Sequence, residues 1–164
     1  MEYQIAAMQQ LAEILEMKNR VKARVIAQQL PIWQNGYPLD EFIIEDIAKG
    51  EGRVVVLEGK VVAYAHFHTS TDDEDYPADT FLSEPVQSFG RLMVDDGYTG
   101  QGIGRFLVAK MIEEAKNLPV KGMGILVDDC NIKAVKLYQS FGFQKEGEGQ
   151  FPFAYLDIYG LYWK

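Results

Sequence analysis

The residues of clearest chemical interest are three alternating glycines at positions 100, 102 and 104. They lie between a segment expected to be a strand, 88–94, and a segment expected to be a helix that runs to about residue 117. Glycine tolerates positive φ and lets a ligand approach the backbone closely. The start of a helix leaves backbone N–H groups at the positive end of the helix dipole. The pattern therefore predicts a site for an anion such as a phosphate or pyrophosphate.

Other glycine-rich phosphate loops fit this bend poorly. A dinucleotide-binding fingerprint that begins at Gly102 requires glycine at position 107, where Leu107 stands. A P-loop requires Lys and then Ser or Thr after its last glycine, but Gly104 is followed by Arg105 and Phe106. The structural alternative is a tight turn whose glycines only allow a helix to pack closely on a strand.

The segment Thr99-Gly100-Gln101-Gly102-Ile103-Gly104 resembles the acetyl-CoA loop of the GNAT superfamily of N-acetyltransferases. The family pattern is Arg or Gln, two residues of any type, Gly, any residue, and then Gly or Ala. Gly102 and Gly104 match its two glycine positions. Thr99 departs from the pattern because Arg or Gln usually stands there, so one long side chain that helps to order the loop is missing.

A second motif supports the same resemblance. The segment 131–143 is similar to a later helix of the family, with Asn, Tyr and Gly-Phe at matching intervals. The strand that ends at Val94 also stands where the family has its pantetheine-binding strand. Two separate motifs at this separation extend the resemblance over residues 87–147.

The resemblance implies an acetyl-CoA-dependent N-acetyltransferase, in which a primary amine of a small molecule or peptide attacks the thioester directly. In that family the strand ending at Val94 and the strand 123–127 splay apart, and the pantetheine arm pairs with backbone between them. The N–H of Val94 then faces the thioester oxygen. The cofactor-binding residues implied are Met93, Val94, Thr99, Gly100, Gln101, Gly102, Ile103, Gly104, Arg105 and Asn131.

Tyr138 stands at the position of the family's general acid. A phenol of pKa ~10 can donate a proton to a departing thiolate, whose own acid has a pKa of ~8.5. Spacing alone also allows a core role, because Val135, Tyr138 and Phe141 share one helical face. Asn131 is likewise either a ligand of the cofactor arm or a helix N-cap.

Two aromatic residues, Trp33 and Tyr37, stand between the first two expected helices. This region borders the acceptor site in GNAT proteins, so the two rings are candidates for the walls of an amine pocket, with cation–π attraction. The alternative is that they pack the loop onto the sheet.

The base that deprotonates the amine is not specified by any motif. His66 and His68 alternate on an expected strand and therefore face one side, and imidazole has a suitable pKa. We take His66 as the candidate on the substrate side. Glu41, Glu84 and Asp95 are further options, as is a chain of water molecules. No metal site is expected, because the two histidines lack cysteine partners at ligand spacing.

Hydrophobic periodicity predicts a mixed α/β sheet in one domain spanning 1–164. The resemblance specifies a GNAT-like fold with a mostly antiparallel sheet of six to seven strands and about four helices. A loop is expected at 69–86, where five of the eight residues at 72–79 are acidic, as a solvated loop or a lid that attracts amines. The expected helices are 5–29, 39–48, 104 to about 117, and 131–141. The expected strands are 53–58, 61–67, 88–94, 123–127, 143–148 and 155–163.

Composition excludes several classes of function. The length of 164 residues suits about one domain, and the net charge of −8 argues against a general nucleic-acid binder. The sequence contains no run of 18 apolar residues, so no membrane-spanning helix is expected. The single Cys130 forms no internal disulfide, and the first residues carry no secretory signal, so a cytoplasmic protein is expected.

Two features leave alternatives open. Thr99 leaves room for a CoA-binding regulatory or interaction module that has lost turnover. The stretch 151–163 holds six aromatic residues, and we expect a strand that contributes to the core. The alternative is an exposed edge strand that forms the interface of a homodimer.

Overall fold

The computed structural model describes residues 1–69 and 85–163. The chain forms two compact units: one comprises Met1–Phe67 and Gly90–Met111, and the other comprises His68–Phe89 and Ile112–Lys164. We call them unit 1 and unit 2. That the chain works as a single domain stays a prediction. The expected loop at 69–86 lies almost wholly outside the described residues.

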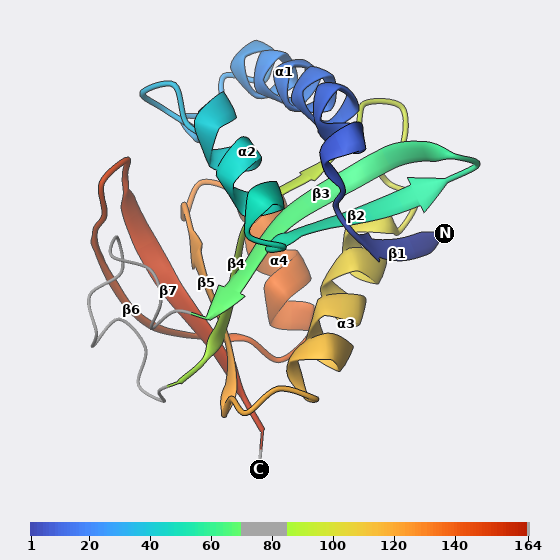
Figure 1. Cartoon of the computed structure of the whole chain (residues 1–164). Helices are drawn as coiled ribbons and strands as arrows, with labels where there is room; N and C mark the ends of the chain where they lie inside the picture. The colour runs from blue at the N-terminus through green and yellow to red at the C-terminus, as the bar shows by residue number, and fades with distance from the viewer. Residues whose placement is uncertain (70–84, 164) are drawn as a thin grey trace. The chain divides into compact units, whose positions relative to one another are not determined.

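Seven strands are hydrogen-bonded in the order β1-β2-β3-β4-β5-β7-β6 (Figure 1). The strands are β1 (Glu2–Ile5), β2 (Gly52–Leu57), β3 (Lys60–Thr69), β4 (Gln87–Val94), β5 (Gly122–Val127), β6 (Gln144–Gln150) and β7 (Tyr155–Tyr162). The helices are the 3₁₀ turn η1 (Met8–Gln10), α1 (Leu11–Ala27), α2 (Asp40–Ala48), α3 (Ile103–Ala115) and α4 (Ile132–Ser140). The mixed α/β class expected from the sequence is confirmed.

The expected helix at 5–29 is wrong at its start. Glu2–Ile5 is a strand that pairs antiparallel with β2, and α1 begins only at Leu11. Between them, Ala7 has an extended backbone and its N–H donates to the Gln10 side chain at 2.8 Å. The backbone hydrogen bonds of residues 2–5 therefore go to a strand about fifty residues away in sequence, which helical periodicity cannot detect.

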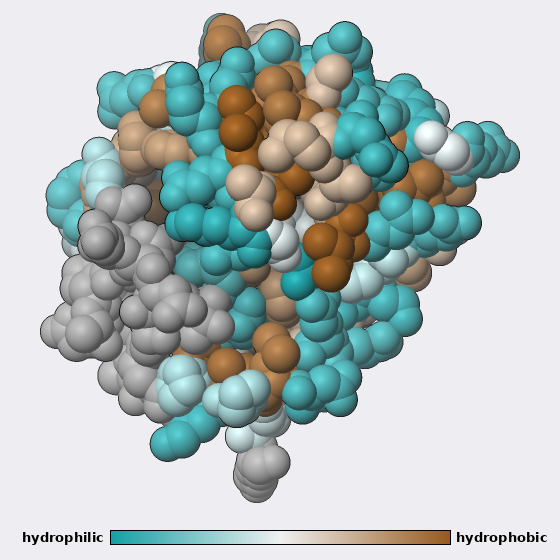
Figure 2. Space-filling view, viewed as in Figure 1, coloured by the Kyte–Doolittle hydropathy of each residue, from teal (hydrophilic) through white to brown (hydrophobic). Residues whose placement is uncertain are grey.

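Unit 1 is built on a core between α1, α2 and the strands. The stripe on α1 predicted from spacing is buried, and it packs with α2 and strand residues such as Tyr64 and Met93. Its members are Ile14, Met17, Val21 and Val25. Figure 2 shows apolar side chains gathered over the α1–α2 region, where Ile26 and Ile44 remain exposed. Within the described ranges, no helix combines the length and apolar character needed to cross a membrane.

The β2–β3 hairpin forms as predicted. Glu58 and Gly59 both have positive φ, at 51° and 77°, which is the requirement of a type I′ turn. The turn sets Leu57 opposite Lys60, and a register shift between Val55 and Val56 then places Gly52 opposite His66. The hairpin thereby places His66 beside the end of α2, where the chain enters β2.

Unit 2 joins β5, β7 and β6 as antiparallel neighbours, and β4 joins β5 in parallel. β4 pairs with β5 over Gln87–Phe89, and Gly90 is the first residue of β4 that belongs to unit 1. The next residue, Arg91, has a left-handed φ of 50°. A non-glycine residue adopts that conformation at a cost of ~1–3 kcal/mol, so other contacts must hold Arg91 in place.

Candidate functional site

The bend after β4 has the backbone that its glycines predicted. Gly97, Gly100 and Gly102 have φ values of 83°, 76° and 79°. Gly102 accepts the first bond of α3, from Phe106 N–H at 2.9 Å, so the N–H groups of the first turn lie just past it. Gly104 lies inside α3 and needs no unusual φ.

The two glycines of the bend face open space. A Cβ built on Gly100 or Gly102 would meet no heavy atom of the described residues within 4 Å. Close packing of the helix on the strand therefore does not explain them. The Gln101 side chain also donates to Gly97 O at 3.0 Å and closes the turn internally. The result is an exposed helix start with room beside its backbone, which suits a phosphate group.

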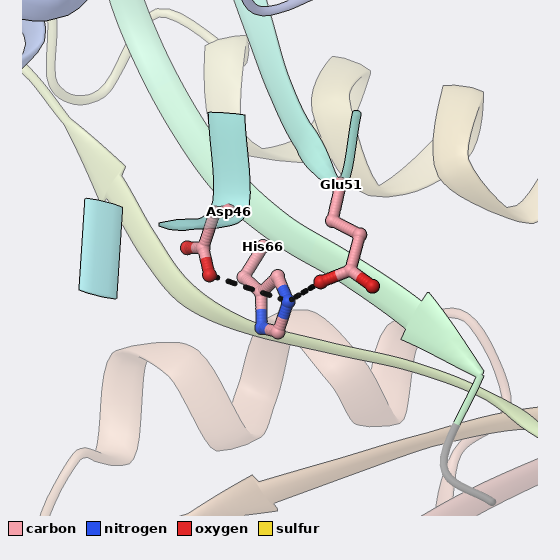
Figure 3. A group of neighbouring side chains, drawn as sticks. All are labelled: Asp46, Glu51 and His66. Atoms are coloured by element: carbon pink, nitrogen blue, oxygen red, sulfur yellow. Dashed lines mark hydrogen bonds and ion pairs between the residues drawn. The ribbon is translucent and has the colours of Figure 1, made fainter. Parts of the chain in front are cut away.

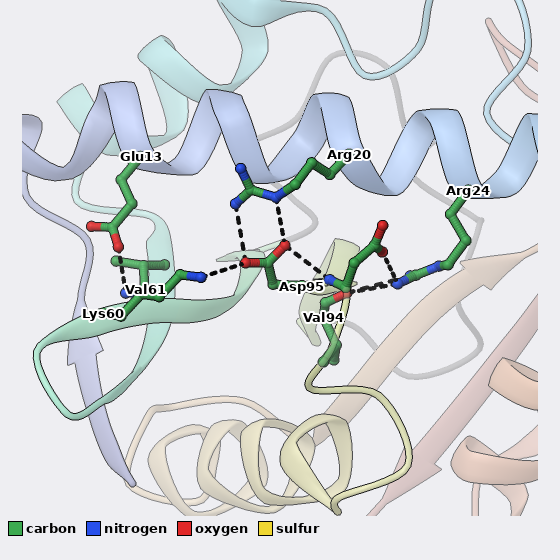
Figure 4. A network of polar contacts seen from close by, with 8 residues as sticks. Glu13, Arg20, Arg24, Lys60, Val61, Val94 and Asp95 are labelled. Carbon is green, nitrogen blue, oxygen red and sulfur yellow. Dashed lines mark hydrogen bonds and ion pairs between the residues drawn. The ribbon is translucent and has the colours of Figure 1, made fainter.

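A buried carboxylate fixes the backbone at the entrance to this bend. Asp95 is 1% exposed and accepts from Nε and Nη2 of Arg20 at 2.9 and 3.0 Å (Figure 4). Lys60 Nζ lies 3.4 Å from Asp95 Oδ2, the oxygen that also accepts from Arg20 Nη2. The Asp95 N–H donates to Val62 O at 2.9 Å. Burial alone would raise the pKa of Asp95, but the Arg20 hydrogen bonds and charge outweigh it and hold the pKa below its ordinary value. Asp95 is thus an ionised anchor, which disfavours the role of base.

The end of β4 is tied to α1 by a second arginine. Both terminal nitrogens of Arg24 donate to Val94 O at 3.3 Å, and the same guanidinium pairs with Asp96. Met93 is buried in the core of unit 1. Arg24 and the Asp95 N–H bond therefore hold the single peptide group between Val94 and Asp95, through its carbonyl (Figure 4) and its N–H. That peptide directly follows the Val94 N–H expected to face the thioester oxygen.

The turn out of α2 brings two carboxylates together. Gly50 has a φ of 72° and its N–H donates to Ile47 O at 3.0 Å, while Glu51 N–H donates to Asp46 O at 2.8 Å. This pair of bonds is the Schellman ending of a helix, which requires a left-handed residue such as glycine. It folds Glu51 back beside Asp46, so both carboxylates reach His66 across the hairpin (Figure 3).

A polar network surrounds His66. Its Nε2 lies 2.8 Å from Glu51 Oε2 and 3.4 Å from Asp46 Oδ1, and its Nδ1 lies 3.0 Å from Arg91 Nη1. Tyr64 O–H donates to Asp46 Oδ2 at 2.6 Å, and Arg91 Nε lies 3.5 Å from the same oxygen. Burial, and then the Asp46 charge, raise the pKa of Tyr64. Sequence reasoning missed Asp46, Glu51 and Arg91; the glycine at position 50, just past a predicted helix, was the available signal.

Of the residues expected on the acceptor side, the structure brings Tyr37 and His66 to the same arginine. The Arg91 guanidinium lies 5.7 Å from the Tyr37 ring centre and 5.1 Å from that of Phe42. Trp33 lies elsewhere: it packs against the core of unit 1 and lines a hollow beside the end of α1. The contacts of Arg91 explain how its strained backbone is held.

The network around His66 suits protons better than a metal ion. Ligand atoms of Asp46, Glu51 and His66 lie within 4.8 Å of one another. A metal on Nε2 would need the lone pair of that nitrogen, but a guanidinium can only donate, so Arg91 requires the lone pair at Nδ1 and places the proton on Nε2.

Unit 2 carries the two residues of the second motif. Tyr138 is 3% exposed, and its ring meets Phe89 and Phe143 with centroids 5.4 and 6.2 Å apart. Burial raises the pKa of Tyr138, so the phenol holds its proton at neutral pH. Asn131 caps α4 by accepting from Ala134 N–H at 3.4 Å. The core and N-cap interpretations are therefore both met, and the catalytic and cofactor roles of the two residues stay predictions.

The lone cysteine is unsuited to covalent catalysis. Burial, and then the neighbouring Asp128, raise the pKa of Cys130 to about 12. A nucleophilic cysteine needs a thiolate at working pH. The thiol therefore stays protonated, which favours direct attack by the acceptor. The remaining base candidates from sequence are Glu41, which is exposed on α2, and Glu84, which lies outside the described residues.

The chain is similar to known acetyltransferases in sequence. The model of the acetyltransferase (GNAT) family matches residues 10–143. Over 62 residues the chain is 36% identical to a spermine/spermidine N(1)-acetyltransferase of Bacillus subtilis (strain 168); the match is 37% of this chain and 41% of that relative, so it spans less than half of the relative's length.

Solved structures share the fold. An acetyltransferase of the GNAT family from Streptococcus agalactiae superposes with a TM-score of 0.80 at 19% identity, over 99% of this chain and 95% of that one. A ribosomal-protein-alanine N-acetyltransferase from Brucella melitensis gives a TM-score of 0.70 at 23% identity, over 98% and 97%. At these identities the likeness concerns the fold alone.

Proposed function

Because the chain belongs to the acetyltransferase (GNAT) family, we propose that it transfers the acetyl group of acetyl-CoA to a primary amine by direct attack on the thioester. The observation that carries this proposal is the bend after β4. Its left-handed Gly100 and Gly102 face open space at the start of α3, which supports binding of the CoA diphosphate through backbone N–H groups. A protein of net charge −8 can bind a polyanion in this way without a basic surface.

The chemistry follows from the groups at the end of β4. The pantetheine arm is proposed to pair with the backbone of Met93 and Val94 as an added strand would. The Val94 N–H then stabilises negative charge that develops on the thioester oxygen. Arg24 and Asp95 support this role, because their contacts hold the peptide group that directly follows Val94. Thr99, Gln101, Ile103 and Arg105 complete the proposed loop around the cofactor, as expected from sequence.

Departure of CoA requires a proton on its sulfur. We assign that proton to Tyr138, whose phenol is protonated at neutral pH. Its burial against Phe89 and Phe143 supports a fixed ring. The assignment requires the Tyr138 O–H to reach the sulfur in the complex with acetyl-CoA, and Asn131 to contact the cofactor arm while it caps α4.

We propose a small cationic amine of the polyamine type as the acceptor. The excess of acidic residues favours approach of a polycation, and the relative that is 36% identical over 62 residues is named for spermine and spermidine. Tyr37 and His66 lie on the proposed acceptor side, around Arg91. The homodimer and the cytoplasmic location remain expectations of the same kind.

Turnover of acetyl-CoA with spermidine, an aminoglycoside, free amino acids and a short peptide tests the proposal. We expect Tyr138→Phe to lower kcat about 10²-fold or more, with an unchanged shift of Tm on adding CoA. The matched control is Tyr155→Phe, which removes a hydroxyl from a residue that is 57% exposed and should leave kcat within twofold. A protein that binds CoA and acetylates none of these amines would instead be the non-catalytic CoA-binding module.

A further inference from the structure

We propose that the Glu51 carboxylate takes the proton of the acceptor ammonium, and that Arg91 holds His66 as the neutral Nε2–H tautomer that orients Glu51. This inference rests on the proposed acetyl transfer and assigns its base. His66 and Arg91 are then positioning residues, and Glu51 is the group that contacts the amine.

The tautomer follows from donor and acceptor inventory. Arg91 Nη1 lies 3.0 Å from His66 Nδ1, and a guanidinium has donors only. Nδ1 must therefore carry a lone pair, so the single ring proton of neutral imidazole sits on Nε2. That N–H points at Glu51 Oε2, 2.8 Å away. A doubly protonated imidazolium would set an N–H against an N–H of Arg91, so the arrangement disfavours His66 as the base.

Exposure separates Glu51 from Asp46 and Asp95. The Asp46 side chain is 4% exposed and is shared by Tyr64, Arg91 and His66. Asp95 is 1% exposed and anchored by Arg20. The Glu51 side chain is 28% exposed, so solvent and a ligand can reach a carboxylate whose orientation His66 fixes from within.

The groups around the imidazole come from four elements. Asp46 faces it from α2, Glu51 from the turn that leads into β2, Arg91 from β4, and Tyr64 belongs to the same strand, β3. Two carboxylates would favour an imidazolium and one guanidinium opposes it. Removal of Arg91 frees Nδ1 beside two carboxylates and should therefore allow a second proton on the ring, whereas Arg91 in place keeps the ring neutral.

The proposed step balances without another reactant. One N–H proton of the ammonium passes to a Glu51 oxygen, and the freed nitrogen lone pair forms the C–N bond with the thioester carbon. The C–S bond breaks, the sulfur leaves with its electron pair and takes a proton from Tyr138, and a second N–H proton leaves the attacking nitrogen for solvent, so that the product is a neutral amide. Solvent then removes the proton from Glu51 and restores that of Tyr138.

The tautomer is tested by nitrogen-15 NMR of the imidazole rings, which is simple because the chain holds two histidines. His68→Gln assigns the remaining signal. We expect the Nε2–H pattern for His66 from pH 8 to pH 6. Arg91→Met should let the ring take a second proton by pH 6. Arg91→Lys, which keeps a donor and a charge, should keep the ring neutral and is the variant to measure if Arg91→Met folds poorly. An imidazolium, or a proton on Nδ1, in the wild type at pH 7 overturns the proposal.

The role of Glu51 is tested by measuring kcat and, in the same variant, the change of Tm that CoA binding causes. Glu51→Gln should lower kcat by 10²–10⁴-fold, with the CoA-induced change of Tm intact. Glu45→Gln is the control, because Glu45 is an exposed residue of α2 that pairs with Lys49; it should leave kcat unchanged. A Glu51→Gln enzyme that keeps half of the wild-type kcat overturns the assignment and leaves acetyl transfer standing. A wild type that acetylates no amine overturns the proposed function itself, and the role of Glu51 with it.

Discussion

Asp95 is the residue whose replacement tests how the end of β4 is held. Asp95→Asn keeps the shape of the side chain and removes its charge. Arg20 loses its two-oxygen acceptor, and the new NH₂ group must face Arg20 or Lys60, which are donors themselves. The backbone bond from Asp95 N–H to Val62 O is untouched, so the effect reports the carboxylate alone.

The magnitude follows from burial. Hydrogen bonds to a charged group contribute ~1.5–3 kcal/mol each, and loss of one partner from a fully buried pair costs ~3–5 kcal/mol. Asp95 is 1% exposed but the Arg20 side chain is 41% exposed, so water screens one side of the pair. We therefore expect a loss of about 2–3 kcal/mol of unfolding free energy. For a chain of this size that corresponds to a fall in Tm of about 4–12 °C.

Thermal unfolding by circular dichroism measures this loss, and the neighbouring Asp96→Asn is the matched control. Asp96 is 43% exposed and pairs with Arg24, so its replacement should cost below ~1 kcal/mol. Equal Tm values for the two variants would refute the anchor. In the same samples we expect the KM for acetyl-CoA to rise for Asp95→Asn, because the loop that follows Asp95 loses its support.

The pH dependence has a definite sign. The folded pKa of Asp95 lies below its ordinary value, so its ionised form stabilises the folded state at every pH above the unfolded pKa of ~3.9. This contribution is lost as the pH falls through the lower folded pKa. The Tm difference between wild type and Asp95→Asn should therefore be constant from pH 8 to pH 5 and shrink below about pH 4.

Five further substitutions, two of them controls, test other parts of the account. Gly102→Ala and Gly59→Ala both place a side chain at positive φ in open space, so each should cost ~1 kcal/mol, but only Gly102→Ala should raise the KM for acetyl-CoA, in steady-state assays. Gly122→Ala would set a Cβ 2.4 Å from a backbone oxygen and should lower Tm by well over 4 °C, whereas Gly147→Ala, with ordinary contact at 3.8 Å, should be mild. Cys130→Ala should keep wild-type kcat, and treatment of the wild type with thiol reagents should leave its kcat unchanged, because the thiol of pKa about 12 is not a nucleophile.

Local signals explain what the sequence could predict of the fold. The buried face of α1, the α2 helix before Gly50 and the Glu58-Gly59 turn all depend on neighbours within a few residues. The strand at Glu2–Ile5 was missed because its partner, β2, lies far along the chain. A four-residue segment has too few positions for alternation to compete with the helical pattern that follows it.

The same distinction separates the two parts of the candidate site. The glycine bend is contiguous, so its backbone could be predicted from the order of residues alone. The network of His66, Glu51 and Arg91 comes from three segments that only the strand pairing and the turn at Gly50 bring together. Arg91 in particular has an unusual φ, and no local pattern marks an arginine within a strand as left-handed.

The central claim is that backbone N–H groups at the start of α3 bind the diphosphate of CoA. Thermal unfolding with increasing CoA, and with pantetheine as a ligand without the diphosphate, tests it most directly. At a CoA concentration of 100 times Kd, binding adds ~2.7 kcal/mol, so we predict a rise in Tm of about 5–11 °C that pantetheine at equal concentration does not produce and that Gly102→Ala reduces. A Tm unmoved by millimolar CoA, or moved equally by pantetheine, would contradict the account.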